Sequence, residues 1–209
     1  MTGLAVIVPF KAAKQKSRLA AALDDTQRRR LSILMLEAVL AAVGGAGLAP
    51  ACHVVSSDDE ALRLARTAGG TPFPESENRG VNAAVSLGMK HARASRYLVL
   101  PADLPLLTAS DLTRAMALSK QGADIVLSPS RLMDGTNLLL FSRRNEVPLS
   151  YDSNSFWTHL GAAASLGYSA AVYTGCGAVL DIDTVEDLAL LAGARHGGEA
   201  AAFAREVSP

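Results

Sequence analysis

The stretch Tyr97-Leu-Val-Leu-Pro-Ala-Asp103-Leu-Pro-Leu-Leu107 decides the fold expected for this chain. Its first four residues form a short apolar run, which is typical of a strand covered on both faces of a parallel sheet. Pro101 cannot donate a hydrogen bond to a neighbouring strand, so we expect the strand to end there. Asp103 follows at the carboxyl end, where ligands of open α/β sheets collect. It could anchor a metal ion there or cap the next turn, and this stretch alone leaves both interpretations open.

The rest of the chain alternates similar apolar runs with helical patterns. We predict strands over residues 4–9, 52–56, 97–101, 124–127, 137–141, 170–173 and 178–182, and helices over about 26–43, 59–68, 82–92, 110–120 and 156–166 and from 184 onward. A proline-rich loop is expected from Thr71. Such alternation is typical of βαβ units. We therefore expect a three-layer, Rossmann-like α/β fold with a mostly parallel sheet. We expect a single domain over 1–209, with a loosely ordered Gly/Ala-rich tail over 194–209.

The composition argues against several classes of partner. Lys plus Arg (20) equals Asp plus Glu (20), so no basic excess points to nucleic acid or to an anionic membrane. Cys52 and Cys176 fit no metal or redox spacing. The N-terminal apolar run is too short for a signal peptide, and no stretch is long enough to span a bilayer. We expect a globular, cytoplasmic protein.

The loop after the first strand carries Lys11, Lys16 and Arg18 together with the Ser17 hydroxyl. A loop at this place faces the ligand crevice, and several cationic donors suit a polyphosphate. It is not a Walker A loop, because no Gly-Lys-Ser/Thr follows a glycine at the required spacing. An ordinary solvated basic loop would look the same, so the loop alone leaves both interpretations open.

Asp181 and Asp183 lie two residues apart in a segment that we predict as a strand. In a strand both side chains point to the same face, so they could converge on one ion. With Asp103 they would form an oxygen site suited to Mg²⁺. Asp183 could instead cap the helix that begins after Thr184.

The basic loop and the carboxylates together indicate nucleotidyl transfer, in which a substrate oxyanion attacks the α-phosphorus of a nucleoside triphosphate and pyrophosphate leaves. This chemistry depends on positioning and charge neutralisation, with no covalent protein nucleophile. Metal ions would stabilise the attacking and leaving oxygens. Lys16 and Arg18 would meet the negative charge that builds on pyrophosphate.

At this point the chain resembles a known family, the 2-phospho-L-lactate guanylyltransferases, whose close relatives act on phosphoenolpyruvate or 3-phosphoglycerate in deazaflavin coenzyme biosynthesis. The resemblance runs from Val8 to Leu191. The matching pieces are Pro9-Phe-Lys11, Lys16-Ser17-Arg18-Leu19, Val54-Val55-Ser56, Asn82-Ala-Ala-Val85, Pro101-Ala-Asp103-Leu-Pro105, Gly135-Thr136-Asn137, Ser155-Phe156 with His159, and Leu180-Asp-Ile-Asp183. Their occurrence together and in order is far more specific than any one of them.

The resemblance implies a nucleotidyltransferase fold, GTP as the nucleotide donor, and Mg²⁺ held by Asp103, Asp181 and Asp183. It also implies that Thr136 and Ser155 hold a phosphorylated acid. We expect the nucleotide to contact Pro9, Lys11, Lys16, Ser17, Arg18, Ser56, Asn82 and Pro101. For Ser56 and Asn82, starting a turn or capping a helix is the alternative.

Two positions depart from the family pattern. Ala12 stands where the family usually has Gly after the Lys, and Asp152 stands where the Gly-x-x-Ser of the acid site has Gly. A carboxylate beside an anionic substrate is unfavourable unless it binds metal, turns away or is protonated. Our hypothesis is that Asp152 shifts or impairs binding of the usual phospho-acid.

Some residues fit structural roles better. We expect His159 to make structural hydrogen bonds, and we favour core or interface packing over guanine stacking for Trp157. His53, His91 and His196 receive no role. A homodimer is left open, as are two other functions: a nucleotide-sugar-dependent glycosyltransferase and a non-catalytic nucleotide-binding protein. The absence of a D-x-D around Asp103 and the basic first loop count against the glycosyltransferase.

Overall fold

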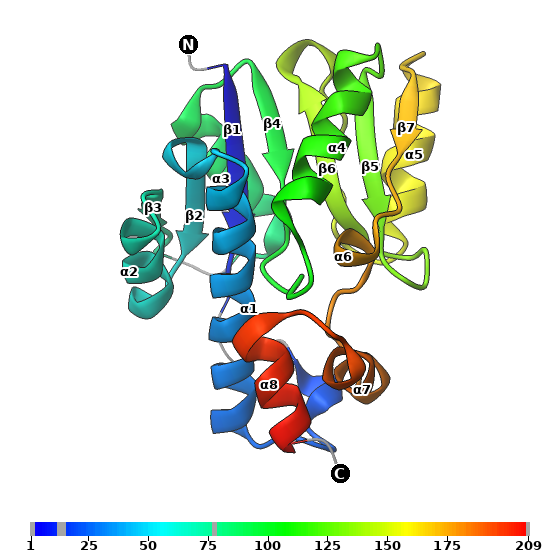
Figure 1. Cartoon of the computed structure of the whole chain (residues 1–209). Coiled ribbons are helices and arrows are strands. Elements are labelled where there is room, and N and C mark those ends of the chain that lie inside the picture. The colour runs from blue at the N-terminus through cyan, green and yellow to red at the C-terminus, as the bar shows by residue number, and fades with distance from the viewer. Residues whose placement is uncertain (1–2, 12–15, 77–78, 208–209) are drawn as a thin grey trace.

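The computed structural model describes residues 3–11, 16–76 and 79–207. These residues form a seven-stranded sheet with the order β3-β2-β1-β4-β6-β5-β7 (Figure 1). The strands are β1 (Leu4–Pro9), β2 (Cys52–Ser56), β3 (Thr71–Pro74), β4 (Arg96–Val99), β5 (Ile125–Pro129), β6 (Thr136–Ser142) and β7 (Ala170–Val172). β6 is antiparallel to β4 and β5, and the other neighbouring pairs are parallel. The expected mostly parallel sheet is confirmed.

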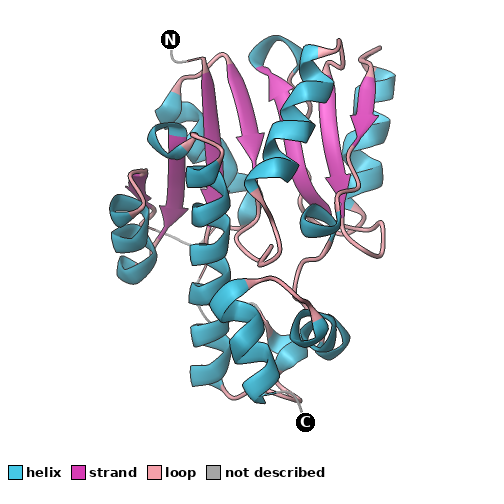
Figure 2. Ribbon diagram, in the orientation of Figure 1, coloured by secondary structure: helices cyan, strands magenta, loops and turns pink. Residues whose placement is uncertain are grey.

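Helices cover both faces of this sheet, as Figure 2 shows. One face packs against α1 (Asp25–Gly45), α2 (Asp59–Thr67), α4 (Ala109–Lys120) and α6 (Cys176–Val179), and the other packs against α3 (Val81–Ala92) and α5 (Ser155–Ser165). In β1, Val6 and Val8 belong to the first core, whereas Ala5 and Ile7 belong to the second. Since successive side chains of a strand point to opposite faces, a strand buried on both faces must be apolar throughout.

Two segments differ from the expected elements. The proline-rich segment from Thr71 forms strand β3, at the edge of the sheet, where proline is tolerated because one side of the strand has no neighbour. The segment expected as a strand over 178–182 contains the short helix α6 and then an irregular extended stretch. It has no strand partner in the described sheet.

The C-terminal segment differs most from expectation. Instead of a loosely held tail, α8 (Gly198–Val207) packs with α7 (Val185–Gly193) against α1, below the carboxyl ends of the parallel strands (Figure 1). These elements share a third core that includes Met35, Leu188 and Phe203. The guanidinium of Arg30 lies 5.0 Å from the centre of the Phe203 ring. We interpreted the Ala-rich composition as a loose tail, but alanine favours helix and can be buried, so this segment forms an amphipathic helix.

The antiparallel strand β6 has a direct consequence for function. Because it runs against β4, its amino end lies at the edge of the sheet where β1 and β4 end. Thr136 and Asn137 therefore begin a strand at the edge where Pro9 ends β1 and Pro101 follows β4. Among the described helices, none combines the length and apolar character needed to cross a membrane.

Candidate active site

A cleft of about 660 Å³ lies at this edge of the sheet. Most of the residues singled out from the sequence line it: Pro9, Lys11, Lys16, Arg18, Pro101, Asp103, Thr136, Asp152, Ser155, Asp181 and Asp183. They come from segments that are far apart in the chain, and the ends of β1, β4 and β6 bring them together. The cleft is therefore the candidate active site.

Lys16 forms an ion pair with two carboxylates in the cleft. Its Nζ lies 2.6 Å from Oδ2 of Asp103 and 2.5 Å from Oδ1 of Asp183, and the residue is 8% exposed. Burial alone lowers the pKa of the ammonium, but the charges of Asp103 and Asp183 outweigh it, so the pKa lies above its ordinary value. Lys16 thus carries a permanent positive charge between the carboxylates, a contact that the sequence did not predict.

Asp181 is held beside this pair by Asn137. The Asn137 side-chain amide donates a hydrogen bond of 3.0 Å to Oδ1 of Asp181. Burial, and next the charge of Asp103, raise the pKa of Asp181 to about 6. Asn137 is 3% exposed, and sequence reasoning assigned it no role although it belongs to the matched Gly135-Thr136-Asn137 piece.

The segment that carries Asp181 and Asp183 is extended without belonging to the sheet. Leu180 and Ile182 are buried in the third core, whereas the two Asp side chains between and after them are partly exposed in the cleft. The backbone N–H of Ile182 donates to the carbonyl oxygen of Asp103, at 3.2 Å. The expected alternation of buried and partly exposed side chains is therefore present. It results from the burial of Leu180 and Ile182 and not from pairing with a neighbouring strand.

The oxygen atoms of the three carboxylates are suitable ligands for a hard divalent cation. Oδ1 of Asp103 is buried and has no hydrogen-bond partner among the described residues. Burial is the largest cause of the raised pKa of Asp181, and the charges of Asp103 and Asp183 raise it further. Lys16, however, lies between two of these carboxylates. Among the described residues, no three His, Cys, Asp or Glu side chains are arranged so that they could hold a metal ion. Oxygen donors of this kind are those that Mg²⁺ prefers.

Two hydroxyl groups, those of Thr136 and Ser155, belong to residues that also line the cleft. Ser155 Oγ donates to Thr136 Oγ1 at 3.1 Å, and Nδ1 of His159 lies 2.9 Å from the same oxygen. Ser155 is the first residue of α5, whose N-terminal turn lines the cleft with Ser153 and Asn154. The partial positive charge at a helix N-terminus favours an anion there.

Asn82 connects α3 to the loop before α5. Its side-chain carbonyl accepts from the backbone N–H of Tyr151 at 2.8 Å, and its amide lies 3.3 Å from Oδ2 of Asp152. Both polar atoms of Asn82 therefore contact the loop that carries Asp152. Asp152 itself is exposed and lines the cleft, so it has not turned away from the site.

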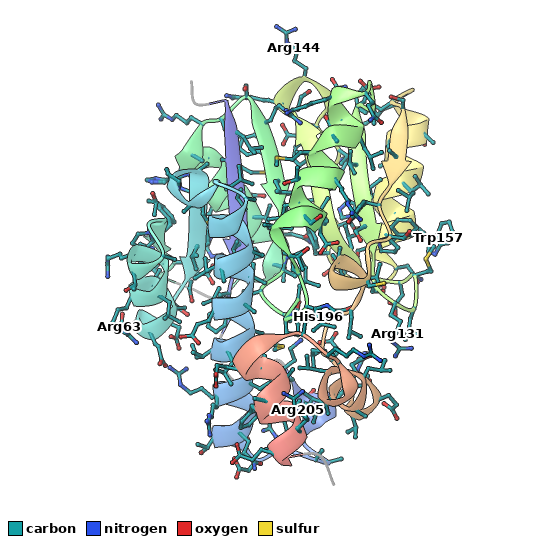
Figure 3. The ribbon with its side chains drawn as sticks, viewed as in Figure 1. Arg63, Arg131, Arg144, Trp157, His196 and Arg205 are labelled. Atoms are coloured by element: carbon teal, nitrogen blue, oxygen red, sulfur yellow. The ribbon has the colours of Figure 1, made fainter. Side chains whose placement is uncertain are left out.

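Other residues singled out from the sequence lie outside the cleft wall or outside the described residues. Ser17 starts a short 3-10 turn (Ser17–Leu19) and is exposed. Ser56 is fully buried, and its hydroxyl accepts from the backbone N–H of Asp58 before α2, which matches its alternative role in a turn. Trp157 is 55% exposed and points away from the sheet (Figure 3), so packing in the core is wrong, whereas packing at an interface stays a prediction. Ala12 lies outside the described residues.

The loop between β5 and β6 is tied to α7 by Arg131. Its Nη2 lies 2.8 Å from Oδ1 of Asp187, and Figure 3 shows the labelled arginine beside α7. Asp187 also closes the capping box of α7 with Thr184. The contact joins α7 to the β5–β6 hairpin, which carries Thr136.

A model of the family described as guanylyl transferase CofC like matches residues 4–208. The chain belongs to this family. Among curated proteins, the phosphoenolpyruvate guanylyltransferase of Rubrobacter xylanophilus is 38% identical to this CofC-like chain over 189 residues, covering 88% of the chain and 91% of that protein. The 2-phospho-L-lactate guanylyltransferase of Methanocaldococcus jannaschii is 28% identical over 184 residues, covering 88% and 80%. The resemblance inferred from the motifs is confirmed, and the CofC-like chain is an enzyme of the nucleotidyltransferase class.

A solved structure confirms the fold. A protein from Desulfovibrio desulfuricans G20 described as a nucleotide-diphospho-sugar transferase superposes on the CofC-like chain with a TM-score of 0.76. The match covers 99% of this chain and 95% of the other at 16% sequence identity. At this identity the likeness bears on the fold alone, and it supports the expected three-layer, Rossmann-like architecture.

Proposed function

We propose that this enzyme transfers the GMP moiety of GTP to a small phosphorylated carboxylic acid, namely phosphoenolpyruvate, 2-phospho-L-lactate or 3-phosphoglycerate, in the biosynthesis of a deazaflavin coenzyme. The observation that carries the proposal is the placement of Lys16, three carboxylates and the Thr136–Ser155 hydroxyl pair in the same cleft. The names of the curated relatives support the class of acceptor.

In the proposed reaction, a phosphate oxygen of the acceptor attacks the α-phosphorus of GTP. A new P–O bond forms there while the bond between the α-phosphorus and the oxygen of the β-phosphate breaks, and pyrophosphate leaves with the electron pair. No protein nucleophile takes part. The protein contributes by aligning two anions that repel each other, and such alignment is a large part of catalysis.

Lys16 and Arg18 provide the positive charge for the phosphates. Arg18 is exposed on the cleft wall and, within the part of the chain that the structure describes, forms no ion pair with Asp103 or Asp183, so it can approach a phosphate directly. Two of the three hydrogens of Lys16 Nζ donate to Asp103 and Asp183, which leaves one for a phosphate oxygen. We infer that these contacts are exchanged when nucleotide and metal enter together.

Mg²⁺ would be held by Asp103, Asp181 and Asp183 and would neutralise charge on the phosphates when bound. The charge of the cleft supports this inference. Among the residues that the structure describes, five aspartates line it (Asp103, Asp134, Asp152, Asp181 and Asp183), together with the three cations Lys11, Lys16 and Arg18. Two anionic substrates would add further negative charge, so external cations are needed for them to bind side by side.

Pyrophosphate release from GTP tests the proposal, measured with each of the three phospho-acids and with and without Mg²⁺. We expect release only when GTP, Mg²⁺ and one of the acids are all present, with a guanylylated acid detected by mass spectrometry. Binding of GTP without turnover on any acid would contradict the proposal. So would turnover that continues unchanged when ATP replaces GTP.

A further inference from the structure

A chain of hydrogen bonds links the loop before α5 to Thr136 and Ser155, two residues that line the cleft. The backbone N–H of Ser150 donates to Nε2 of His159 at 3.0 Å. Nδ1 of His159 lies 2.9 Å from Oγ1 of Thr136, and Ser155 Oγ lies 3.1 Å from that oxygen. His159 is 0% exposed, Ser155 2% and Thr136 3%, so water does not compete for these contacts.

The direction of each bond follows from one fixed donor. A backbone N–H can only donate, so Nε2 of His159 must accept from Ser150 and carries no hydrogen. Burial lowers the pKa of His159 to about 4, so the ring is neutral at physiological pH. A neutral imidazole carries one hydrogen, which must therefore be on Nδ1. His159 thus donates to Thr136.

A count of hydrogens then gives the role of Thr136. A hydroxyl has two acceptor lone pairs and one O–H. The lone pairs of Thr136 Oγ1 receive the hydrogens of His159 Nδ1 and of Ser155 Oγ. The O–H of Thr136 therefore donates to neither His159 nor Ser155. If the bond between the two hydroxyls turned round, the O–H of Ser155 would be left instead, so the pair offers one O–H to the cleft in either case.

We propose that His159 is a positioning residue that holds the Thr136–Ser155 pair as a hydrogen-bond donor to an anionic oxygen of the acceptor. This inference rests on the proposed function and names the chemistry of its acceptor subsite. The subsite takes an ionised phosphoryl or carboxylate oxygen and disfavours a group that can only donate. Fixing the hydroxyl in advance improves binding, since less rotational freedom is lost when the acceptor arrives.

Two substitutions of His159 separate this role from plain structural support. Asparagine places an amide at the position of ring atom Nδ1, where its NH₂ can donate to Thr136, but it does not reach Ser150. Glutamine places its amide near Nε2, where it accepts from Ser150 and leaves Thr136 without its donor. His159→Asn therefore keeps the contact proposed to matter, whereas His159→Gln keeps the contact that anchors the loop.

We expect His159→Gln to raise the KM for phosphoenolpyruvate about tenfold or more, with a smaller effect on kcat, because a hydrogen bond to a charged group is at stake. His159→Asn should keep this KM within about threefold of wild type. In a Thr136→Val background the two substitutions should have equal KM values, since no hydroxyl is left to orient. His196→Asn, on the exposed segment before α8, is the matched control and should leave KM unchanged.

Two readouts are independent of turnover. In ¹⁵N-histidine NMR of the free protein, His159 should show the Nδ1–H tautomer. Titration calorimetry with phosphoenolpyruvate should rank the affinities as wild type, then His159→Asn, then His159→Gln. The Nε2–H tautomer, or equal losses in both variants, would overturn the inference. If GTP turnover is absent while the tautomer and affinity ranking hold, the proposed function fails and the anion subsite stands.

Discussion

Lys16 and Asp103 form a partly buried ion pair in which Nζ lies 2.6 Å from Oδ2, and the same ammonium contacts Asp183. Lys16 thus neutralises part of the negative charge of the carboxylate cluster. A buried carboxylate that loses its partner is costly, so something must always neutralise this cluster. Lys16 and a divalent ion are therefore expected to compete for the same oxygens, which makes the metal affinity of the free enzyme sensitive to residue 16.

We predict that Lys16→Met strengthens Mn²⁺ binding to the nucleotide-free enzyme about tenfold, because the charge that competes with the metal ion is removed. The same substitution should lower kcat, because a proposed contact with phosphate is lost. The free Mn²⁺ signal in electron paramagnetic resonance measures the affinity. Arg18→Met is the control, since it removes the same charge from the cleft wall without touching the carboxylates. Equal changes in Mn²⁺ affinity in both variants would show that only overall charge matters.

Replacing Asp103 should remove metal-dependent turnover. Asp103→Asn keeps the shape of the side chain but loses the charge that both Lys16 and a divalent ion use. We expect kcat/KM for GTP to fall about 100- to 1,000-fold, the range seen when an electrostatic stabiliser of a transition state is lost. Steady-state kinetics with Mg²⁺ measures the loss. Asp59→Asn, on the exposed first turn of α2, should have no effect. Intact Mg²⁺-dependent turnover in Asp103→Asn would contradict the assignment.

Asp152 should weaken binding of a phospho-acid. Its carboxylate is exposed in the cleft, contacts Asn82 at 3.3 Å and lies in the loop that leads to Ser155. Asp152→Gly removes a negative charge near an anionic ligand, so we expect about tenfold tighter binding of at least one of phosphoenolpyruvate, 2-phospho-L-lactate and 3-phosphoglycerate. Isothermal titration measures the three affinities. If wild type and Asp152→Gly bind all three equally, the hypothesis fails.

Stability should fall in acid because of His159. Burial lowers its pKa from 6.5 to about 4 in the folded protein, so between these values the unfolded chain binds more protons. The contribution of His159 is intact above pH 6.5 and is lost as the pH falls toward 4, by on the order of 1 to 3 kcal/mol. Urea unfolding of wild type and His159→Gln at pH 4.5 and pH 7.5 tests this. The variant should lose less stability between the two pH values, and identical losses would count against the prediction.

The C-terminal helix should be essential for stability. Phe203 on α8 is 3% exposed and packs in the third core, so Phe203→Ala should lower the free energy of unfolding by about 3 to 5 kcal/mol. Leu190→Ala on α7 is the matched control, because Leu190 is 49% exposed. Urea denaturation measures both. A similar small loss in the two variants would mean that α8 is held as loosely as its composition indicates.

The order of strands and helices was predictable over most of the chain because it depends on local periodicity. The apolar runs at β1, β2 and β4 and the caps at Asp24 and Thr184 are encoded within a few residues. The misses have a common cause. β3, the extended stretch after α6, and α8 each owe their form to neighbours distant in sequence, so local composition pointed to loops, a strand and a tail.

The sequence by itself indicated the residues of the candidate site: a carboxylate after a buried strand, a basic loop, an Asp-x-Asp pair and, through the family resemblance, a Thr and a Ser proposed to hold the acid. Only the tertiary structure decided how these parts contact one another. Lys16 meets Asp103 and Asp183, Asn137 orients Asp181, and His159 donates to Thr136. These contacts depend on distances of about 3 Å between side chains from separate strands and loops. Packing of three cores sets those distances, whereas local periodicity sets only which residues face the same way.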